Sequence, residues 1–567
     1  MNRIIQIFAS ILVLHQVMHA QIQNEINIPS LISGNQIPLN IHPGTRPFFD
    51  GPLTNTFGVN QYDYLGPTIE LTKGQWVQFQ VTNNIADTTN LHWHGLQVPA
   101  IADGPMTMIM PGEVWSPEFE VINRAGTYWY HPHIHKKTAA QALKGAVGII
   151  IVRDTVEAQL DLPRDYGVDD FPIVIQSIQF DSSNQALPRG MNDSTIFVNG
   201  VRANYDFEAT LHVPAQWVRF RILNGSGERT FNVGLSNNQN FSVIASDNGL
   251  LSETVYVNRI RVSPGERYEI LVNFNNLVGS EWSLTNYGSE LAMGIQGGPT
   301  MPMPAGSPDM SSPLNGTDFN LLKFIVDEPT GTGLSEVSSV FEPIANLNPN
   351  AVNQQRLIVM SAQDQMNMDG PFFFNNLSYD MDRIDYTIPL NSIETWVLQN
   401  MTMVAHPFHM HAVAFQIVAR DGNPAIEQER GWKDVVLIEP QETVEIIARF
   451  NVYSDSLTPY VYHCHILMHE DDGMMGQFLV IDPTTEVSNL NDNSNFEIYP
   501  NPSAGLVFWK SEESITKVQI WNCMGELIWT QLSIPNQPLN LSELPPGIYH
   551  LEAYGTEQKW IRKLVVN

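Results

Sequence analysis

The chain has 567 residues, of which 43% are hydrophobic, and its 38 Gly and 37 Pro are typical of a globular, turn-rich and β-rich protein. At about 150 residues per domain, this length predicts roughly three or four domains. The formal net charge of −30 argues against a nucleic-acid partner, because phosphate binding needs clustered Lys and Arg and the chain has no basic stripe.

The first twenty residues have the pattern of a secretory signal peptide. Arg3 precedes an apolar run from Ile4 to Leu14, and Ala20 is a suitable cleavage position. A membrane anchor is the alternative, but the run is short and no later segment reaches the roughly 20 apolar residues that span a bilayer. The sequence therefore predicts a signal peptide over residues 1–20 and no transmembrane segment.

Short alternating or apolar segments separated by turn residues dominate the rest of the chain, and helical periodicity is scarce. Clear strand patterns occur at residues 68–84, 217–225, 267–274, 394–401 and 443–450. The strands fall into blocks with the turn spacing of β-sandwiches, at 25–160, 165–325 and 340–485. A Pro, Gly and Ser-rich stretch (297–316) precedes the third block, a polar linker (486–495) follows it, and a smaller β-rich block covers 496–567. The predicted fold class is therefore all-β.

Four clusters carry most of the sixteen histidines: "HWHG" (92–95), "HPHIH" (131–135), "HPFHMH" (406–411) and "HCHILMH" (463–469). Each cluster contains a His-x-His pair. Residues i and i+2 of a strand point to the same face, so four pairs would offer eight convergent nitrogens. A single pair is more often structural than metal-binding, but four pairs favour a cluster of imidazole-binding metal ions.

Cys464 stands between His463 and His465, and the chain has only one other cysteine, Cys523. The two cysteines lie in different blocks, which disfavours a disulfide between them. If the two histidines face one metal cluster, Cys464 must point to the opposite face and serve a second site. Nearby His406, His469 and Met474 would complete a blue-copper electron-transfer site of two His, one Cys thiolate and a weak axial Met. Residues 463–465 would then form a covalent bridge between the two sites.

The four motifs, in this order over roughly residues 40–482, resemble those of the three-domain bacterial multicopper oxidases, which include laccases and copper-efflux cuprous oxidases. The resemblance implies three cupredoxin-like Greek-key β-sandwiches and four copper ions. It places type 1 copper at His406, Cys464, His469 and Met474, and type 2 copper at His92 and His409. The implied ligands of the type 3 pair are His94, His131, His133, His411, His463 and His465. The second block carries no ligand cluster and would act as a spacer domain.

The implied reaction is one-electron oxidation of a small reducing substrate, laccase-like and phenolic or aromatic, coupled to four-electron reduction of O2 to water. Asp103 and Glu470 are assigned to proton delivery and cluster tuning, against the alternative of structural carboxylates. His135 is expected to lie beside the site or at the surface rather than to bind metal. Trp129 and Tyr130 are interpreted as core aromatic residues rather than redox relays.

Two rival functions stay open at this point. The nearest is a cuprous oxidase for copper detoxification, since thioethers suit Cu(I). Seven methionines are candidate contacts for Cu(I): Met106, Met108, Met110, Met293, Met301, Met303 and Met310. Filling of irregular gaps is the preferred interpretation of these residues, and no long Met-rich insertion is evident. The other rival is a non-catalytic copper-binding protein, which would need neither two kinds of site nor a bridge; a copper nitrite reductase would not need the full type 3 set.

The tail contains "FEIYPNPSAG" (496–505), "VQIWNCMGELI" (518–528), "LNLSELPPGIYHLEA" (539–553) and a final "RKLVVN". This order of motifs is similar to the C-terminal sorting domain of type IX secretion in Bacteroidota, and an ordinary accessory β domain is the alternative. The resemblance implies a small β-sandwich that is recognised by the type IX secretion machinery and directs the protein across the outer membrane. Cys523 would belong to this part, and the protein would be secreted or displayed at the cell surface.

Overall fold

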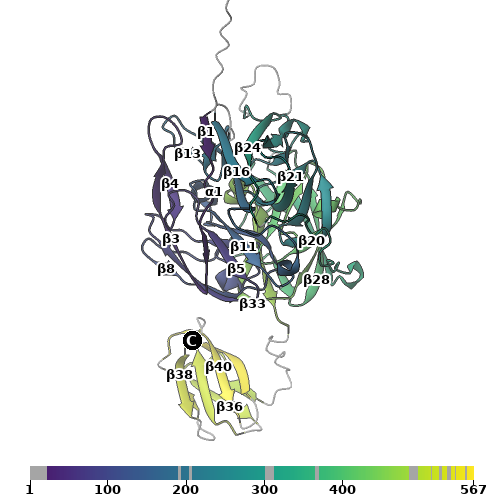
Figure 1. Cartoon of the computed structure of the whole chain (residues 1–567). Coiled ribbons are helices and arrows are strands. Elements are labelled where there is room, and N and C mark those ends of the chain that lie inside the picture. Colours follow the sequence, from purple (N-terminus) through teal and green to yellow (C-terminus); the bar gives the residue numbers. More distant parts are fainter. Residues whose placement is uncertain are drawn as a thin grey trace, which may run out of the picture. The chain divides into compact units, whose positions relative to one another are not determined.

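The computed structural model describes residues 22–188, 193–203, 207–300, 312–331, 333–363, 370–483, 496–511, 514–522, 527–532, 538–542, 544–555 and 559–567. The predicted signal peptide (1–20) and linker (486–495), Cys523, Met301, Met303 and Met310 lie outside these residues. The chain divides into two compact units, Met1–Ile481 and Asp482–Asn567 (Figure 1).

The described residues form 41 strands and only two short α-helices, α1 (Thr138–Ala142) and α2 (Leu467–Asp471), which confirms the all-β prediction. The 3-10 turns are η1 (Ala100–Ala102), η2 (Glu157–Gln159), η3 (Gly288–Glu290), η4 (Pro349–Ala351) and η5 (Glu427–Glu429). No helix of the described part is long and apolar enough to cross a membrane.

The first sandwich contains a sheet with the strand order β2 (Leu31–Ser33), β5 (Thr68–Thr72), β11 (Gly148–Arg153), β10 (Gly126–His131) and β7 (His92–His94). Its other sheet has the order β4 (Thr54–Val59), β3 (Gln36–Arg46), β6 (Trp76–Asn83) and β8 (Val114–Trp115), with β9 (Glu118–Glu120) also paired to β6. Alternate residues of β6, such as Val77, Phe79 and Val81, are buried in one core with Trp93 and Ile150 of the other sheet. This alternation is why the segment folds as a strand with one face on the core.

The second sandwich has one sheet in the order β1 (Ile22–Glu25), β16 (Phe207–Pro214), β24 (Asp318–Asp327), β23 (Glu281–Tyr287), β18 (Phe231–Leu235) and β21 (Ile260–Val262). The other has the order β15 (Val201–Arg202), β14 (Thr195–Val198), β12 (Asp170–Phe180), β17 (Trp217–Asn224), β22 (Arg267–Asn273), β19 (Phe241–Ser246) and β20 (Gly249–Val257), with β13 (Ala186–Leu187) beside β12. The first strand of the described residues, β1, therefore belongs to the second sandwich. A core that includes Phe220, Leu322 and Phe324 joins the two sheets.

The third sandwich contains the order β26 (Phe372–Phe374), β25 (Gln354–Ala362), β28 (Ser392–Asn400), β32 (Thr443–Phe450) and β30 (Phe415–Arg420). Its second sheet has the order β27 (Tyr386–Pro389), β34 (Met475–Ile481), β33 (Asp455–Cys464), β29 (His406–Met410) and β31 (Val435–Ile438). Trp396, Phe408 and Phe478 lie in the shared core. Four of the five segments predicted as strands are single strands in the structure, and the fifth, 68–84, folds as two strands, β5 and β6, joined by a turn.

The C-terminal unit is also built from two sheets. One has the order β35 (Phe496–Tyr499), β36 (Leu506–Ser511) and β39 (Leu539–Asn540). The other has the order β38 (Leu527–Leu532), β37 (Lys517–Trp521), β40 (Gly547–Tyr554) and β41 (Lys559–Val566). Phe496, Val507 and Leu551 share its core, so the predicted small β-sandwich is confirmed.

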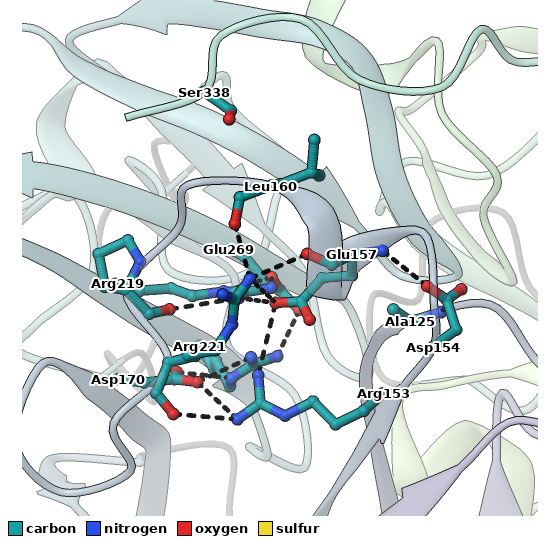
Figure 2. Close-up of polar contacts among 12 residues, drawn as sticks. Ala125, Arg153, Asp154, Glu157, Leu160, Asp170, Arg219, Arg221, Glu269 and Ser338 are labelled. Carbon is teal, nitrogen blue, oxygen red and sulfur yellow. Dashed lines mark hydrogen bonds and ion pairs between the residues drawn. The ribbon is translucent and has the colours of Figure 1, made fainter. Parts of the chain in front are cut away.

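A network of buried charges joins the first sandwich to the second (Figure 2). The Arg221 guanidinium lies 2.7 Å from an oxygen of Asp170 and 2.7 Å from one of Glu269. Arg153, at the end of β11, lies 3.0 Å from Asp170, and Arg219 lies 2.8 Å from Glu157. Burial raises the pKa of Asp170, but the charges of Arg221, Arg219 and Arg153 outweigh burial and hold this pKa well below its usual range. Asp170 therefore stays ionised, and each arginine of this network has a carboxylate partner.

We predict that Arg221→Ala lowers the thermal unfolding midpoint strongly, because it leaves Asp170 and Glu269 without the partner they share. Loss of one partner from a buried ion pair costs about 3–5 kcal/mol. Lys137→Ala is the matched control, since its pair with Asp87 is about half exposed on both sides and exposed pairs contribute less than about 1 kcal/mol. Equal midpoints for the two variants, measured by calorimetry, would show that the buried network does not stabilise the junction.

Candidate metal centre

The four histidine motifs meet where the first and third sandwiches face each other. Within the first sandwich, His131 of β10 stands opposite His92 of β7 in the strand register. Within the third, His409 of β29 stands opposite His463 of β33. Strand pairing thus places two motifs side by side in each sandwich, and the Nε2 atoms of His133 and His463 approach within 3.1 Å across the interface.

Contacts between ring nitrogens divide six of the eight histidines into two groups of three. In one group, His94 Nδ1 lies 3.4 Å from His131 Nε2 and 3.2 Å from His465 Nε2. In the other, His463 Nε2 lies 3.1 Å from His133 Nε2 and 3.2 Å from His411 Nε2. Both groups combine residues of the first and third sandwiches.

The hydrogen bonds on the far side of these rings fix which nitrogen carries the proton. His131 Nδ1 donates to the Pro132 carbonyl at 2.9 Å, and His463 Nδ1 donates to the Cys464 carbonyl at 3.0 Å. His411 Nδ1 donates to a carboxylate oxygen of Asp103 at 2.7 Å. A neutral imidazole has one donor and one acceptor, so the inward nitrogens of these rings are acceptors. Acceptors that face one another without a donor fit a bound cation.

His92 and His409 form the remaining pair. Their Nδ1 atoms donate to the backbone carbonyls of Asp103, at 3.1 Å, and Asp434, at 2.8 Å. Their Nε2 atoms are buried and have no hydrogen-bond partner among the described residues. Both residues, together with His411, belong to a set whose ligand atoms all lie within 4.8 Å of one another. The eight nitrogens are therefore arranged as three, three and two.

Burial favours the neutral form of the inward-facing histidines. It lowers the pKa of His94, His131, His133, His409, His411 and His465 well below the usual value. The pKa of His463 falls to about 3, with burial as the largest cause. Neutral imidazole is the form that binds metal, so the rings are ready to act as ligands.

The two carboxylates selected from the sequence both touch the cluster. Asp103 follows η1 and contacts His92 and His411. Glu470 in α2 accepts a hydrogen bond from the Thr138 hydroxyl at 2.6 Å. Its two oxygens lie 3.4 Å from His133 Nδ1 and 3.2 Å from His463 Nδ1. Burial raises the pKa of Glu470 well above its usual value.

A third carboxylate, Asp434, was not selected from the sequence. Its Oδ1 accepts from His94 Nε2 at 3.1 Å, and its carbonyl accepts from His409 Nδ1. One local feature of the sequence points to Asp434: the charged pair Lys433–Asp434 stands directly before the apolar strand β31. Two charges at the start of a buried strand need partners. Those partners are distant in the sequence, so the pattern alone does not reveal them.

The predicted second site lies behind the cluster. The Cys464 sulfur is 3.6 Å from Nδ1 of His406 and 3.6 Å from Nδ1 of His469. Cys464 lies at the end of β33 and points away from the face that carries His463, as the alternation predicts. Met474 is fully buried in the same core; its carbonyl accepts from the Cys464 N–H at 3.1 Å, and its N–H donates to the His469 carbonyl at 2.8 Å. One soft sulfur and two imidazole nitrogens suit copper.

The remaining residues singled out from the sequence lie beside the site, in the core or at the surface. His135 is partly buried beside Tyr379 and belongs to none of the metal-binding groups of the described residues. Trp129 and Tyr130 are fully buried core residues, as expected; the Trp129 ring stacks on His131 at 4.2 Å. The gap-filling interpretation of the methionines is wrong for Met108, Met110 and Met293, because their side chains are 50–64% exposed.

The sandwich architecture and the clustered imidazole and thiol ligands define a copper-binding β protein. Models of the multicopper oxidase family match residues 40–157, 174–297 and 349–484, and a model of the secretion system C-terminal sorting domain matches residues 497–567. The multicopper oxidase mco of Staphylococcus aureus is 30% identical over 478 residues, which cover 81% of this chain and 93% of that protein. The chain belongs to the multicopper oxidase family. It is a copper-dependent oxidase that ends in a type IX sorting domain.

Other relatives carry different names. The cell division protein FtsP of Escherichia coli is 30% identical over 468 residues, covering 81% of this chain and 93% of that protein. Among solved structures, a laccase-like multicopper oxidase, CueO, from Ochrobactrum sp. is 32% identical with a TM-score of 0.69, covering 80% of this chain and all of that one. McoA of Aquifex aeolicus is 30% identical with a TM-score of 0.70, covering 81% of this chain and 99% of that one. The names of these relatives indicate different cellular roles. Similarity alone therefore does not identify the substrate of this chain.

We predict that removal of copper with a chelator lowers the thermal unfolding midpoint and that added Cu²⁺ restores it. A ligand that binds only the folded chain stabilises it by about 4 kcal/mol at 1,000 times its Kd. Mg²⁺ is the control cation, since it prefers oxygen ligands and should not replace copper at imidazole nitrogens. An unchanged midpoint after complete stripping, followed by calorimetry, would contradict the metal assignment.

Proposed function

We propose that the chain binds four copper ions and couples the one-electron oxidation of a phenolic or aromatic reductant to the four-electron reduction of O2 to water. The observation that carries this proposal is the arrangement of eight histidine nitrogens as three, three and two, with a separate site at Cys464. We also propose the domain boundaries 25–160, 165–325 and 340–485.

The proposed ligands follow this arrangement. His406, Cys464, His469 and axial Met474 would hold type 1 copper, and His92 and His409 would hold type 2. The two groups of three would hold the type 3 pair: His94, His131 and His465 at one ion, and His133, His411 and His463 at the other. Bound copper would supply the one-electron chemistry at the first site and the reduction of O2 at the cluster.

His469 provides the point where a reducing substrate would approach. Its side chain is 7% exposed, whereas every other proposed histidine ligand is at most 2% exposed. Phe372 packs against both His406 and His469, with ring centroids 4.8 and 4.4 Å apart, and shields the site from solvent. Cys464 is bonded directly to His463 and His465, so its backbone provides a short covalent path to the cluster.

Asp103 and Glu470 are proposed to serve the protons that O2 reduction consumes. Glu470 contacts His133 and His463 of one group of three, and Asp103 contacts His411 of the same group and His92 of the remaining pair. The Thr138 hydroxyl donates to Glu470 and would pass or orient a proton on the side of α1.

A phenolic or aromatic substrate is supported by the similarity to the Ochrobactrum CueO, which is described as having oxidase activity towards lignin model compounds and lignosulfonate. Export supports the same substrate class, because a secreted oxidase meets reductants outside the cell. We propose that residues 1–20 are a signal peptide and that the sorting domain then delivers the chain across the outer membrane to the cell surface or medium.

A cuprous oxidase is the second candidate, and exposed methionines favour it. Met401 and Met403 are 44% and 41% exposed and flank Thr402, whose hydroxyl lies 2.9 Å from His406 Nε2. Met293 is 57% exposed and precedes Gly294. The Gly294 carbonyl accepts a hydrogen bond from the N–H of Ala405, which lies in the same loop as Thr402. Copper storage without catalysis is less well supported, because storage needs neither two kinds of site nor a covalent bridge between them.

We predict that the copper-loaded chain takes up O2 faster with a methoxyphenol than with Cu(I) under matched conditions. Met401→Leu with Met403→Leu, a change that conserves volume, should slow only Cu(I) oxidation. Met108→Leu with Met110→Leu is the control, since those exposed methionines lie outside the His406 loop. Faster turnover of Cu(I) that depends on Met401 and Met403 would establish the cuprous oxidase instead.

We predict that Cys464→Ser abolishes the blue colour and steady-state O2 uptake while the fold and the copper of the histidine cluster remain. Serine is nearly isosteric but lacks the soft sulfur that the site needs. Cys523→Ser, in the sorting domain, is the control and should leave both signals unchanged. Steady-state oxidase activity retained by the Cys464 variant, with normal circular dichroism, would refute the proposed electron route.

A further inference from the structure

We propose that the turn between β21 and β22 (residues 263–266) and the first residue of β22, Arg267, position the histidine cluster from the second sandwich. This inference rests on the proposed function of the cluster. Gly265 fixes the His465 ring, and Arg267 acts through Asp434 on His94 and His409. The second sandwich supplies none of the proposed ligands, yet it forms one wall of the site and is more than a spacer.

His465 is held by packing rather than by a hydrogen bond on its outer nitrogen. Its Nε2 faces His94, but its Nδ1 is buried without a hydrogen-bond partner among the described residues. The outer nitrogens of the other seven cluster histidines each contact a carbonyl or carboxylate oxygen. The orientation of this ring therefore depends on the atoms that press against it.

Gly265 is the residue that presses against this ring. A Cβ at this position would lie 2.9 Å from two ring carbons of His465 and 3.1 Å from its Nδ1, closer than carbon atoms pack. The backbone φ of +85° is also one that only glycine adopts readily. A side chain here would displace the His465 ring from its place opposite His94.

Arg267 holds Asp434 with a two-pronged ion pair. Its Nη1 and Nη2 each lie 2.6 Å from one oxygen of the Asp434 carboxylate, and the guanidinium is fully buried. Nη1 also donates to the Gly265 carbonyl at 3.1 Å, so one side chain ties the turn to the carboxylate. A bidentate Arg–carboxylate pair fixes orientation as well as charge.

Asp434, held in this way, orients two histidines of the cluster, His94 and His409. Its Oδ1 accepts from His94 Nε2, which leaves His94 Nδ1 free to face His131 and His465. Its carbonyl accepts from His409 Nδ1. The second sandwich adds Asp247, whose carboxylate accepts from the backbone N–H groups of Asp434 and Val435 at 3.3 and 3.2 Å.

The buried charges of Figure 2 adjoin the other side of Arg267. Arg267 Nε donates to the Thr127 carbonyl at 3.0 Å, and the Thr127 hydroxyl donates to Glu269 at 2.7 Å. Glu269 in turn pairs with Arg219 and Arg221 (Figure 2). Arg219 is as deeply buried as Arg267 and pairs with carboxylates, but among the described residues its hydrogen bonds reach Glu269, Glu157 and the Pro163 carbonyl rather than Asp434 or a cluster histidine. It is therefore a matched control.

The first test compares Gly265→Ala with Gly74→Ala in the full copper-loaded chain. Both glycines have a φ of +85°, but a Cβ at Gly74 meets nothing within 4 Å. The two variants share the same unfavourable φ, and only at Gly265 does the added Cβ meet the His465 ring. We expect Gly265→Ala to weaken copper binding at the cluster about 10–100-fold while the blue absorption of the Cys464 site is kept. The measurements are copper per chain during titration with a chelator, the blue absorption and the paramagnetic resonance of the cluster.

The second test compares Arg267→Gln with Arg219→Gln by the same measurements. Both substitutions break a buried ion pair and should lower the thermal midpoint, but only Arg267→Gln should release cluster copper selectively. Parallel loss of blue absorption and cluster copper, or copper binding equal to the unchanged chain in both Gly265→Ala and Arg267→Gln, would overturn the positioning role. If the unchanged chain itself binds copper without a blue site or a cluster, the proposed function fails instead.

Discussion

The whole site depends on one electrostatic constraint: acceptor nitrogens that face one another in a buried interface. Two sandwiches bring rings such as His133 and His463 together at 3.1 Å, with the protons held on the outer nitrogens. Such an arrangement is unfavourable by itself, because the lone pairs of buried acceptors repel one another. Cations bound between the nitrogens would convert the repulsion into coordination. The sandwiches and their buried ion pairs hold the rings in that arrangement.

In β33, the alternation of side chains directs two neighbouring residues to two different sites. His463 turns toward the cluster, and Cys464 turns into the core of the third sandwich, where it meets His406 and His469. The two sites are therefore adjacent along the backbone but differ in ligands and surroundings. His469 is the most exposed of the proposed histidine ligands, at 7%, so a reducing substrate and O2 would react at separate places. The fold thus explains why an oxidase of this family needs its cysteine between two histidines.

The features of the site that the sequence predicts are those with local periodicity. The strand alternation, the His-x-His pairs and the opposite direction of Cys464 all follow from a two-residue repeat, and the structure agrees with each. Asp434, Arg267 and Gly265 were not predicted, because their roles depend on contacts between residues more than 150 positions apart. The methionine interpretation failed for a related reason. Whether Met108 or Met293 fills a gap or faces solvent is decided by the neighbouring loops, not by its own segment.

The central claim is that the eight histidine nitrogens hold three copper ions and the Cys464 site holds a fourth. Anomalous X-ray scattering at the copper absorption edge, from crystals of the copper-loaded chain, tests this claim most directly. Four peaks are expected: one between His406, Cys464 and His469, one between His92 and His409, and one within each group of three histidines. A single peak in the cluster, or none at Cys464, would contradict it.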